Sequence, residues 1–151
     1  MSTAVTGSEV DDLTLSITEE IHVKATPEAT FEALLEELGR GMTGAEEQPM
    51  PMKIEAWPGG RWYRDLGDGN GHFWAHVQAI KRPTLLEFCG PLMLSFAATS
   101  NVQYRLSQDQ GGTMIKFHHY AVGAIPADVR TKMEGGWHAI HERAKRRAER
   151  Q

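Results

Sequence analysis

The sequence predicts a two-layer α+β fold in which a curved antiparallel sheet of about seven strands wraps around one long C-terminal helix, with a short helical segment after the first strand. Two observations carry this prediction. Between residues 52 and 122, short runs of strand-forming residues are separated by glycine-rich turns, as in strands joined by tight connections. From residue 126 onward, apolar residues recur at helical spacing, so this helix needs a sheet to cover its apolar face.

The composition is that of one folded domain. The chain has 151 residues, of which 40% are hydrophobic and 24% are charged, close to the averages for soluble domains. We assign residues 13–148 to a single domain and residues 1–12 to a flexible N-terminal tail. No apolar run approaches the roughly 20 residues of a membrane-spanning helix, and the N-terminus lacks the features of a secretion signal. With a single cysteine as well, the expected location is cytoplasmic.

The first predicted elements are a strand and a helix. Apolar residues alternate between residues 13 and 23, and the Glu19-Glu20 pair within this strand marks either its solvent side or a bulge. Thr26 is a suitable N-cap, Pro27 fits a first helical turn, and apolar residues then recur at helical spacing until Gly39. Residues 40–51 show no hydrophobic periodicity, which predicts a loop that can hold a helical turn.

The remaining strands are predicted from runs bounded by turn signals, and they cover residues 52–57, 61–66, 72–81, 84–89, 98–108 and 113–122. Glycines at 59–60 and 67–71 supply two of the turns, and residues 109–112 form a hairpin. The final helix is predicted over residues 126–147, with an apolar stripe made of Val129, Met133, Trp137, Ile140 and Ala144.

Strand alternation predicts which side chains face the helix. Because Glu87, Arg105 and Lys116 are expected to face water, the inward set is Leu86, Phe88, Val102, Tyr104, Leu106, Ile115, Phe117 and His119. Trp62 joins this set on its aromatic character. The register of residues 72–81 stays open, since the inward side is either that of Phe73, Ala75 and Val77 or that of Trp74 and His76.

Several local features occur in an order that resembles a known family. They are the turn and strand at residues 58–62, the Arg82-Pro83 corner, the Gly112-Thr113 hairpin leading to His119, and Gly136-Trp137 in the last helix. Over residues 13–148 the chain resembles the SRPBCC (START-like) superfamily, and more narrowly its group related to the C-terminal domain of the activator of the heat-shock protein 90 ATPase. The resemblance implies a helix-grip fold with a deep hydrophobic cavity, of the kind that superfamily members use for lipids, hormones, polyketides or aromatic substrates. A chaperone partner is implied by the family name alone.

Metal and nucleophile chemistry are not expected. His138 and His141 fall one turn apart on the last helix, but they lack the spacing and the glutamate of the common zinc-hydrolase motif. The sequence contains no nucleophilic serine elbow and no phosphate-binding or dinucleotide-binding loop. Cys89 has no base near it in sequence and is interpreted as an inert packing residue. We therefore expect no catalytic residue, no metal and no cofactor.

The expected function is the binding of an apolar or amphipathic small molecule between sheet and helix. The expected ligand-binding residues are Trp62, Phe73, Phe88, Tyr104, Phe117, His119, Trp137 and His141. His119 is interpreted either as an anchor for a ligand carbonyl or carboxylate, or as a hydrogen-bonded core residue. Two alternatives stay open: an enzyme of cyclase or hydrolase type that uses cavity histidines and Tyr104 as acid and base, and a chaperone-interacting module. The net charge of −4 argues against nucleic acid as a partner.

Overall fold

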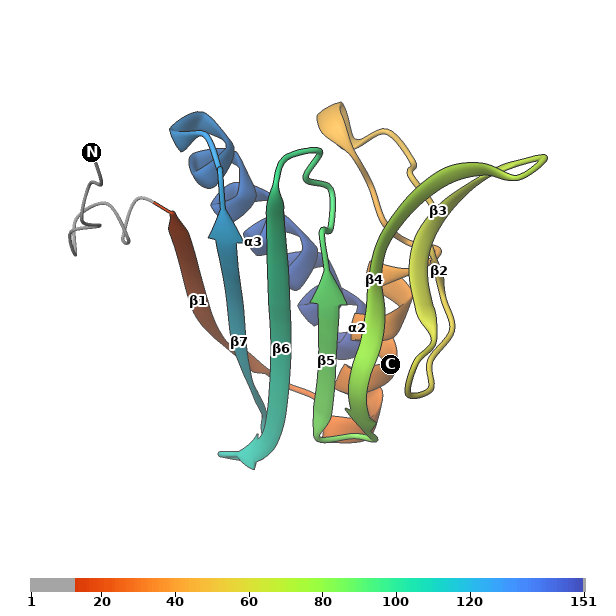
Figure 1. Ribbon diagram of the computed structural model, residues 1–151. Coiled ribbons are helices and arrows are strands. Elements are labelled where there is room, and N and C mark those ends of the chain that lie inside the picture. The colour runs from red at the N-terminus through yellow and green to blue at the C-terminus, as the bar shows by residue number, and fades with distance from the viewer. Residues whose placement is uncertain (1–12, 151) are drawn as a thin grey trace, which may run out of the picture.

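A computed structural model describes residues 13–150 and shows one antiparallel sheet with two helices on the same face (Figure 1). The seven strands lie in the order β1-β7-β6-β5-β4-β3-β2. The elements are β1 Thr14–Val23, α2 Pro27–Leu38, η1 Ala45–Glu47, β2 Lys53–Ile54, β3 Arg61–Gly67, β4 Asn70–Lys81, β5 Leu85–Gly90, β6 Ala98–Asp109, β7 Gly112–Gly123 and α3 Ala127–Glu149. This architecture confirms the predicted helix-grip fold. The tail predicted at residues 1–12 lies outside the described residues.

The first strand and helix form where the sequence predicts them, with one correction. The Thr26 hydroxyl accepts the backbone N–H of Ala29 at 3.1 Å, which caps α2. Strand β1 pairs with β7 along its whole length without a register shift, so the Glu19-Glu20 pair makes no bulge. Because alternation continues through this pair, Glu20 is exposed and Glu19 shares the inner face with Ile17. The prediction of a solvent side is therefore wrong for Glu19.

The central strands β5, β6 and β7 pair without slips, and all eight inward residues predicted on them are buried. Their register places Tyr104 opposite both Leu86 and Phe117, which brings large side chains into one layer. The β6–β7 hairpin closes at Gln110 and Gly111, whose φ angles of 48° and 79° fit the turn that a two-residue connection favours.

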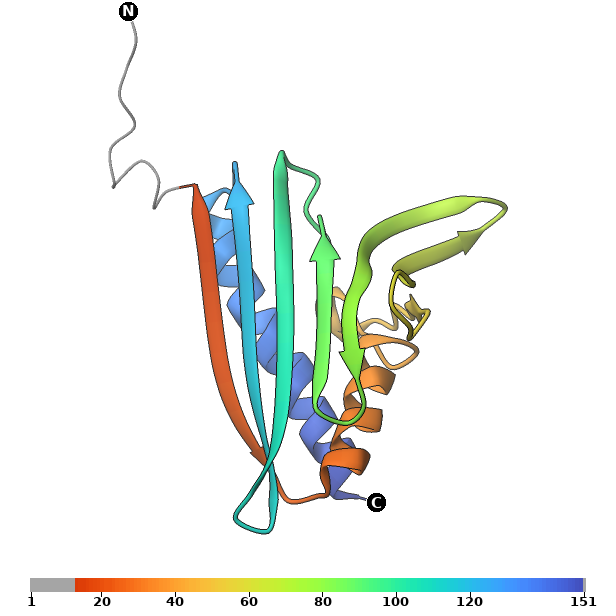
Figure 2. The same cartoon turned by 60° about the horizontal axis from the view of Figure 1, so that its bottom comes forward.

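Strand β4 follows neither of the two alternations that the sequence leaves open. Its pairing with β3 slips between Trp62 and Tyr63, and its pairing with β5 slips between Val77 and Ala79. Each slip changes the face to which the following side chains point. As a result the neighbours Trp74 and Ala75 are both buried, together with Val77, while Phe73 and His76 are exposed. The β3–β4 hairpin bends away from the rest of the sheet (Figure 2).

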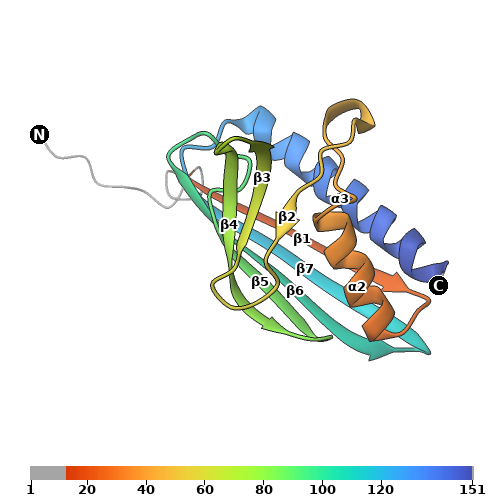
Figure 3. The ribbon, with the colours of Figure 1, turned by 90° about the vertical axis from the view of Figure 1, so that its right-hand side faces the viewer.

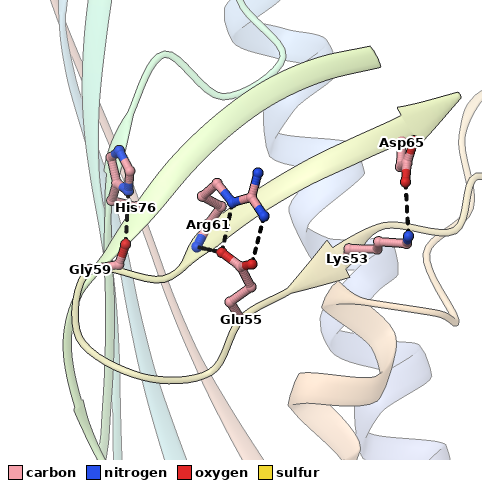
Figure 4. A network of polar contacts seen from close by, with 6 residues as sticks. All are labelled: Lys53, Glu55, Gly59, Arg61, Asp65 and His76. Carbon is pink, nitrogen blue, oxygen red and sulfur yellow. Dashed lines mark hydrogen bonds and ion pairs between the residues drawn. The ribbon is translucent and has the colours of Figure 1, made fainter. Parts of the chain in front are cut away.

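A polar network fixes the turn between β2 and β3 (Figure 4). The Glu55 carboxylate accepts hydrogen bonds from Arg61, from its backbone N–H at 2.9 Å, its Nε at 2.8 Å and its Nη2 at 2.7 Å. These bonds lower the pKa of Glu55 to about 2. His76 donates from Nδ1 to the Gly59 carbonyl oxygen at 3.1 Å. The strand predicted at residues 52–57 is limited to Lys53–Ile54, because the chain already turns at Glu55, whose carbonyl oxygen accepts the N–H of Trp57.

Helix α3 lies across the sheet and beside α2 (Figure 3). Met133, Trp137 and Ile140 are 3–8% exposed, which confirms the predicted apolar stripe. Lys145 donates to the backbone oxygen of His22 at 2.7 Å, and Arg130 donates to that of Thr14. Cations of α3 thus cover both ends of β1, which is an edge strand of the sheet formed by the described residues.

The two helices are joined by a buried carboxylate. Glu37 of α2 is 4% exposed and accepts hydrogen bonds from two arginines of α3, from Arg143 Nε at 3.2 Å and from Arg147 Nε at 2.8 Å. A buried carboxylate is tolerated only where such partners replace water. This contact fixes the position of the C-terminal half of α3 relative to α2.

The turn before β3 gives a test of the fold. A Cβ atom on Gly60 would lie 1.8 Å from the Glu55 carbonyl oxygen, whereas one on Gly59 would meet no atom within 4 Å. Gly59→Ala is therefore expected to cost about 1–2 kcal/mol of unfolding free energy, from its positive φ alone. We expect Gly60→Ala to cost more than that, up to about 3 kcal/mol. Urea unfolding of both variants checks this order, and equal losses would contradict the close approach of Gly60 to Glu55.

Candidate ligand-binding cavity

A cavity of about 660 Å³ lies between α3 and two loops. One loop, residues 42–50, connects α2 to β2, and the other, residues 93–96, connects β5 to β6. Four methionines and three aromatic residues line the cavity: Met42, Met50, Met93, Met133, Trp74, Phe96 and Trp137. The volume lies within the range of small-molecule sites, and the lining is mostly apolar.

Helix α3 supplies one wall of the cavity. Its lining residues recur every three or four positions and include Met133, Gly136, Trp137, Ile140 and Arg143. A Cβ atom on Gly136 would meet no atom within 4 Å, so the cavity is open at this position. The polar lining residues are Thr43, Glu46, Glu47, Lys132 and Arg143.

Of the eight predicted ligand-binding residues, Trp137 lines this cavity. Six others are buried in two aromatic clusters, and one of these six, Phe117, also lines a smaller cavity between β1 and α3. In one cluster Trp62 stacks on Phe88 with ring centroids 4.5 Å apart and meets the edge of Trp74, which reaches the cavity. The second cluster contains Tyr104, Phe117, His119, Trp137 and His141. Phe73 is separate, because it is 38% exposed and packs beside His76.

His119 has both ring nitrogens engaged inside the protein. The indole N–H of Trp137 donates to its Nδ1 at 3.0 Å, so the proton of the neutral ring lies on Nε2 and is donated to the Ser100 hydroxyl at 2.9 Å. Burial, helped by the nearby His118, lowers the pKa of His119 to about 4. His119 is therefore neutral at pH 7 and positions Trp137.

Glu19 links the sheet to α3 through two histidines. Its carboxylate accepts hydrogen bonds from His141 Nδ1 at 2.5 Å and from His138 Nδ1 at 2.6 Å. The hydroxyl of Tyr104 donates to His141 Nε2 at 2.9 Å. Sequence reasoning missed Glu19, although continued strand alternation would have placed it on the inner face.

The pKa shifts follow from this geometry. Burial lowers the pKa of His141, with Glu19 opposing the shift, and burial raises the pKa of Tyr104 well above its usual value. Burial alone would raise the pKa of Glu19, but the two histidine contacts outweigh it and lower that pKa. The hydrogen bond to Glu19 raises the pKa of the exposed His138.

The order Tyr104, His141, Glu19 is one that acid–base catalysis could use, but its buried end does not reach a cavity. Tyr104 is fully buried, as is His141. Glu19 and His138 border a smaller polar cavity of about 340 Å³ between β1 and α3, which Tyr104 and His141 do not line. A general acid or base must lie within hydrogen-bond reach of its substrate. The hydrogen-bonded series Tyr104, His141 and Glu19 instead holds α3 on the sheet.

Cys89 is exposed, which corrects its interpretation as a packing residue, because it lies on the opposite face of β5 from the buried Phe88.

Within residues 13–150 no three His, Cys, Asp or Glu side chains are grouped so that they could hold a metal ion. In the same range, neither helix is long and apolar enough to cross a membrane.

Comparison with family models matches residues 24–149 to the family described as Activator of Hsp90 ATPase homolog 1-like protein. The chain belongs to this family. The match covers most of the domain, from the end of β1 to the end of α3, and places the protein in the SRPBCC superfamily. A search of curated proteins finds no significant match.

Solved structures of other proteins share the fold at low sequence identity. An uncharacterized protein from Rhizobium leguminosarum superimposes with a TM-score of 0.69 at 19% identity, over 91% of this chain and 96% of that chain. Ara h 8.0201 superimposes with a TM-score of 0.69 at 14% identity, over 91% of this chain and 99% of that chain. The di-domain ARO/CYC BexL from the BE-7585A biosynthetic pathway superimposes with a TM-score of 0.64 at 16% identity, over 91% of this chain and 51% of that chain. At these identities the similarity shows the fold.

The buried His119 predicts a pH dependence of stability. Its pKa is about 4 when folded and has the ordinary value of 6.5 when unfolded, so between these values the unfolded chain binds more protons. Stability therefore decreases as the pH falls through this window. At pH 5 we expect the wild type to have lost about 2 kcal/mol relative to pH 7, beyond any loss in His119→Gln, which cannot titrate. Chemical unfolding at both pH values checks this, and parallel profiles for the two proteins would contradict the buried neutral imidazole.

Proposed function

We propose that this protein binds one apolar or amphipathic small molecule in the cavity between α3 and the loops 42–50 and 93–96. The observation that carries the proposal is a cavity of about 660 Å³ lined by methionine and aromatic side chains. Apolar surface of this kind is favourably removed from water by a ligand that fills it. Trp137 would contact the ligand directly, and the buried aromatic clusters behind it would hold the wall in place.

The methionine content of the lining bears on what the cavity accepts. Met42 and Met50 come from one loop, Met93 from the other, and Met133 from α3, so all three sides of the cavity carry a methionine. Methionine is unbranched and flexible, and it fits apolar partners of irregular shape. We therefore infer a site that accepts several related apolar molecules.

Ligand binding is favoured over acid–base catalysis by the lining itself. Among the described residues that line this cavity there is no histidine, tyrosine or cysteine. The alternative of a cyclase or hydrolase that uses Tyr104 and cavity histidines therefore finds neither of these groups at the surface of this cavity. The di-domain ARO/CYC BexL shares the fold at 16% identity, a similarity that does not extend to its activity. A chaperone partner and a cytoplasmic location, both expected from the sequence, stay predictions.

Two adjacent glycines of α3 give a matched test of the cavity. Gly136 lines it and Gly135 does not, and a Cβ atom on either residue would meet no atom within 4 Å. The Gly136→Leu side chain would occupy the cavity, so we expect the affinity for the neutral fluorescent probe N-phenyl-1-naphthylamine to fall at least about tenfold, or about 1.4 kcal/mol. Gly135→Leu should bind the probe as the wild type does. Fluorescence titration measures both affinities.

Thermal melting provides the control for this experiment. Both substitutions replace a helical glycine, which costs about 1 kcal/mol relative to a good helix former, so neither should lower the melting temperature. A loss of binding in Gly136→Leu alone then reports occupation of the cavity. Equal affinities in the two variants would place the probe elsewhere and overturn the proposed site.

A further inference from the structure

Arg143 is a charged residue in an otherwise mostly apolar wall. It lies on α3, it lines the cavity, and its side chain is 21% exposed. Its Nε donates to the Glu37 carboxylate at 3.2 Å. Among residues 13–150, its two terminal nitrogens, Nη1 and Nη2, have no hydrogen-bond partner. A guanidinium carries five N–H donors in a fixed fork, so most of its donors are available to a ligand.

The contact with Glu37 orients Arg143 without cancelling the local positive charge. Glu37 also accepts a hydrogen bond from Arg147 Nε at 2.8 Å, so two cations share one carboxylate and the group as a whole carries a charge of +1. Glu37 is almost fully buried, and a Cβ atom on Gly41 would lie 3.2 Å from its Oε2. The carboxylate is therefore closely surrounded, and it presents the Arg143 guanidinium in one fixed position.

The other charged groups of the lining do not satisfy Arg143. Glu46 and Glu47 lie on the loop, are exposed, and make no ion pair with Arg143 or Lys132 within the described residues. The Lys132 side chain is 79% exposed and lies 3.9 Å from Asp128. Arg143 is thus the cation that combines a fixed orientation, partial burial and unused donors. Such an arrangement suits a planar or tetrahedral anion, which accepts two parallel N–H bonds.

We propose that the cavity is built for an amphipathic acid, whose apolar body packs against Met133 and Trp137 and whose carboxylate or sulfonate binds Arg143. This inference rests on the proposed function, because it names the class of molecule that the same cavity takes. Charge-assisted bonds of this kind are stronger when they lie beside apolar surface than in open water. Arg143 is then the residue that distinguishes an acid from a neutral molecule of the same shape.

Two probes with the same aromatic rings separate charge from apolar contact. N-phenyl-1-naphthylamine is neutral, and 8-anilinonaphthalene-1-sulfonate carries a sulfonate on the same ring system. In Arg143→Gln we expect affinity for the sulfonate probe to fall at least about tenfold, while affinity for the neutral probe changes less than about twofold. Arg146→Gln removes an exposed cation from the same helix and should change neither affinity. In the wild type, affinity for the sulfonate alone should decrease with added salt.

Arg143→Lys tests the geometry of the contact, because it keeps the charge but loses the fork of donors. It should bind the sulfonate with intermediate affinity, and circular dichroism melting should show that both Arg143 variants are folded. An equal effect of Arg143→Gln on the two probes, or no effect on either, would overturn the role of Arg143. If the wild type failed to bind the neutral probe, the proposed function itself would fail, which is a different outcome.

Discussion

The hydrogen bond between the indole of Trp137 and His119 is the contact on which the rest of the structure depends. It joins the middle of α3 to β7 at 3.0 Å, where Trp137 also packs on Phe117. The bond requires a neutral imidazole, which the burial of His119 enforces. Trp137 itself lines the cavity, so the residue that fixes the helix also forms part of the cavity wall.

Two carboxylates also hold helix α3, one on each side of it. On the β1 side, Glu19 binds His138 and His141. On the α2 side, Glu37 binds Arg143 and Arg147. These polar contacts fix the position of the helix relative to the sheet and α2. The two loops, together with Trp74 of β4, close the remaining space. A protein of this size can thereby keep an apolar space that a fully packed core would fill.

The sequence predicts the fold well where inward and outward side chains alternate without interruption along a strand. The inward sets of β5, β6 and β7 are all buried because those strands pair without slips. The same rule fails for β4, because two slips change the face to which its side chains point. At Glu19 the alternation continues, although a charged side chain there favours a prediction of solvent exposure. The cavity was harder to predict. Three of its four methionines lie on loops that have no hydrophobic periodicity. The role of Arg143 depends on Glu37, which is 106 residues away in the chain.

Methionine NMR tests the proposed position of the ligand most directly. Protein labelled with ¹³C at the methionine methyl groups gives separate signals for Met42, Met50, Met93 and Met133, which line the cavity, and for Met114, which lies on β7 opposite His22. On titration with N-phenyl-1-naphthylamine, the signals of the four lining methionines should shift together while that of Met114 stays unchanged. Saturable binding of the probe with no shift at those four methyl groups would contradict a ligand site between α3 and the two loops.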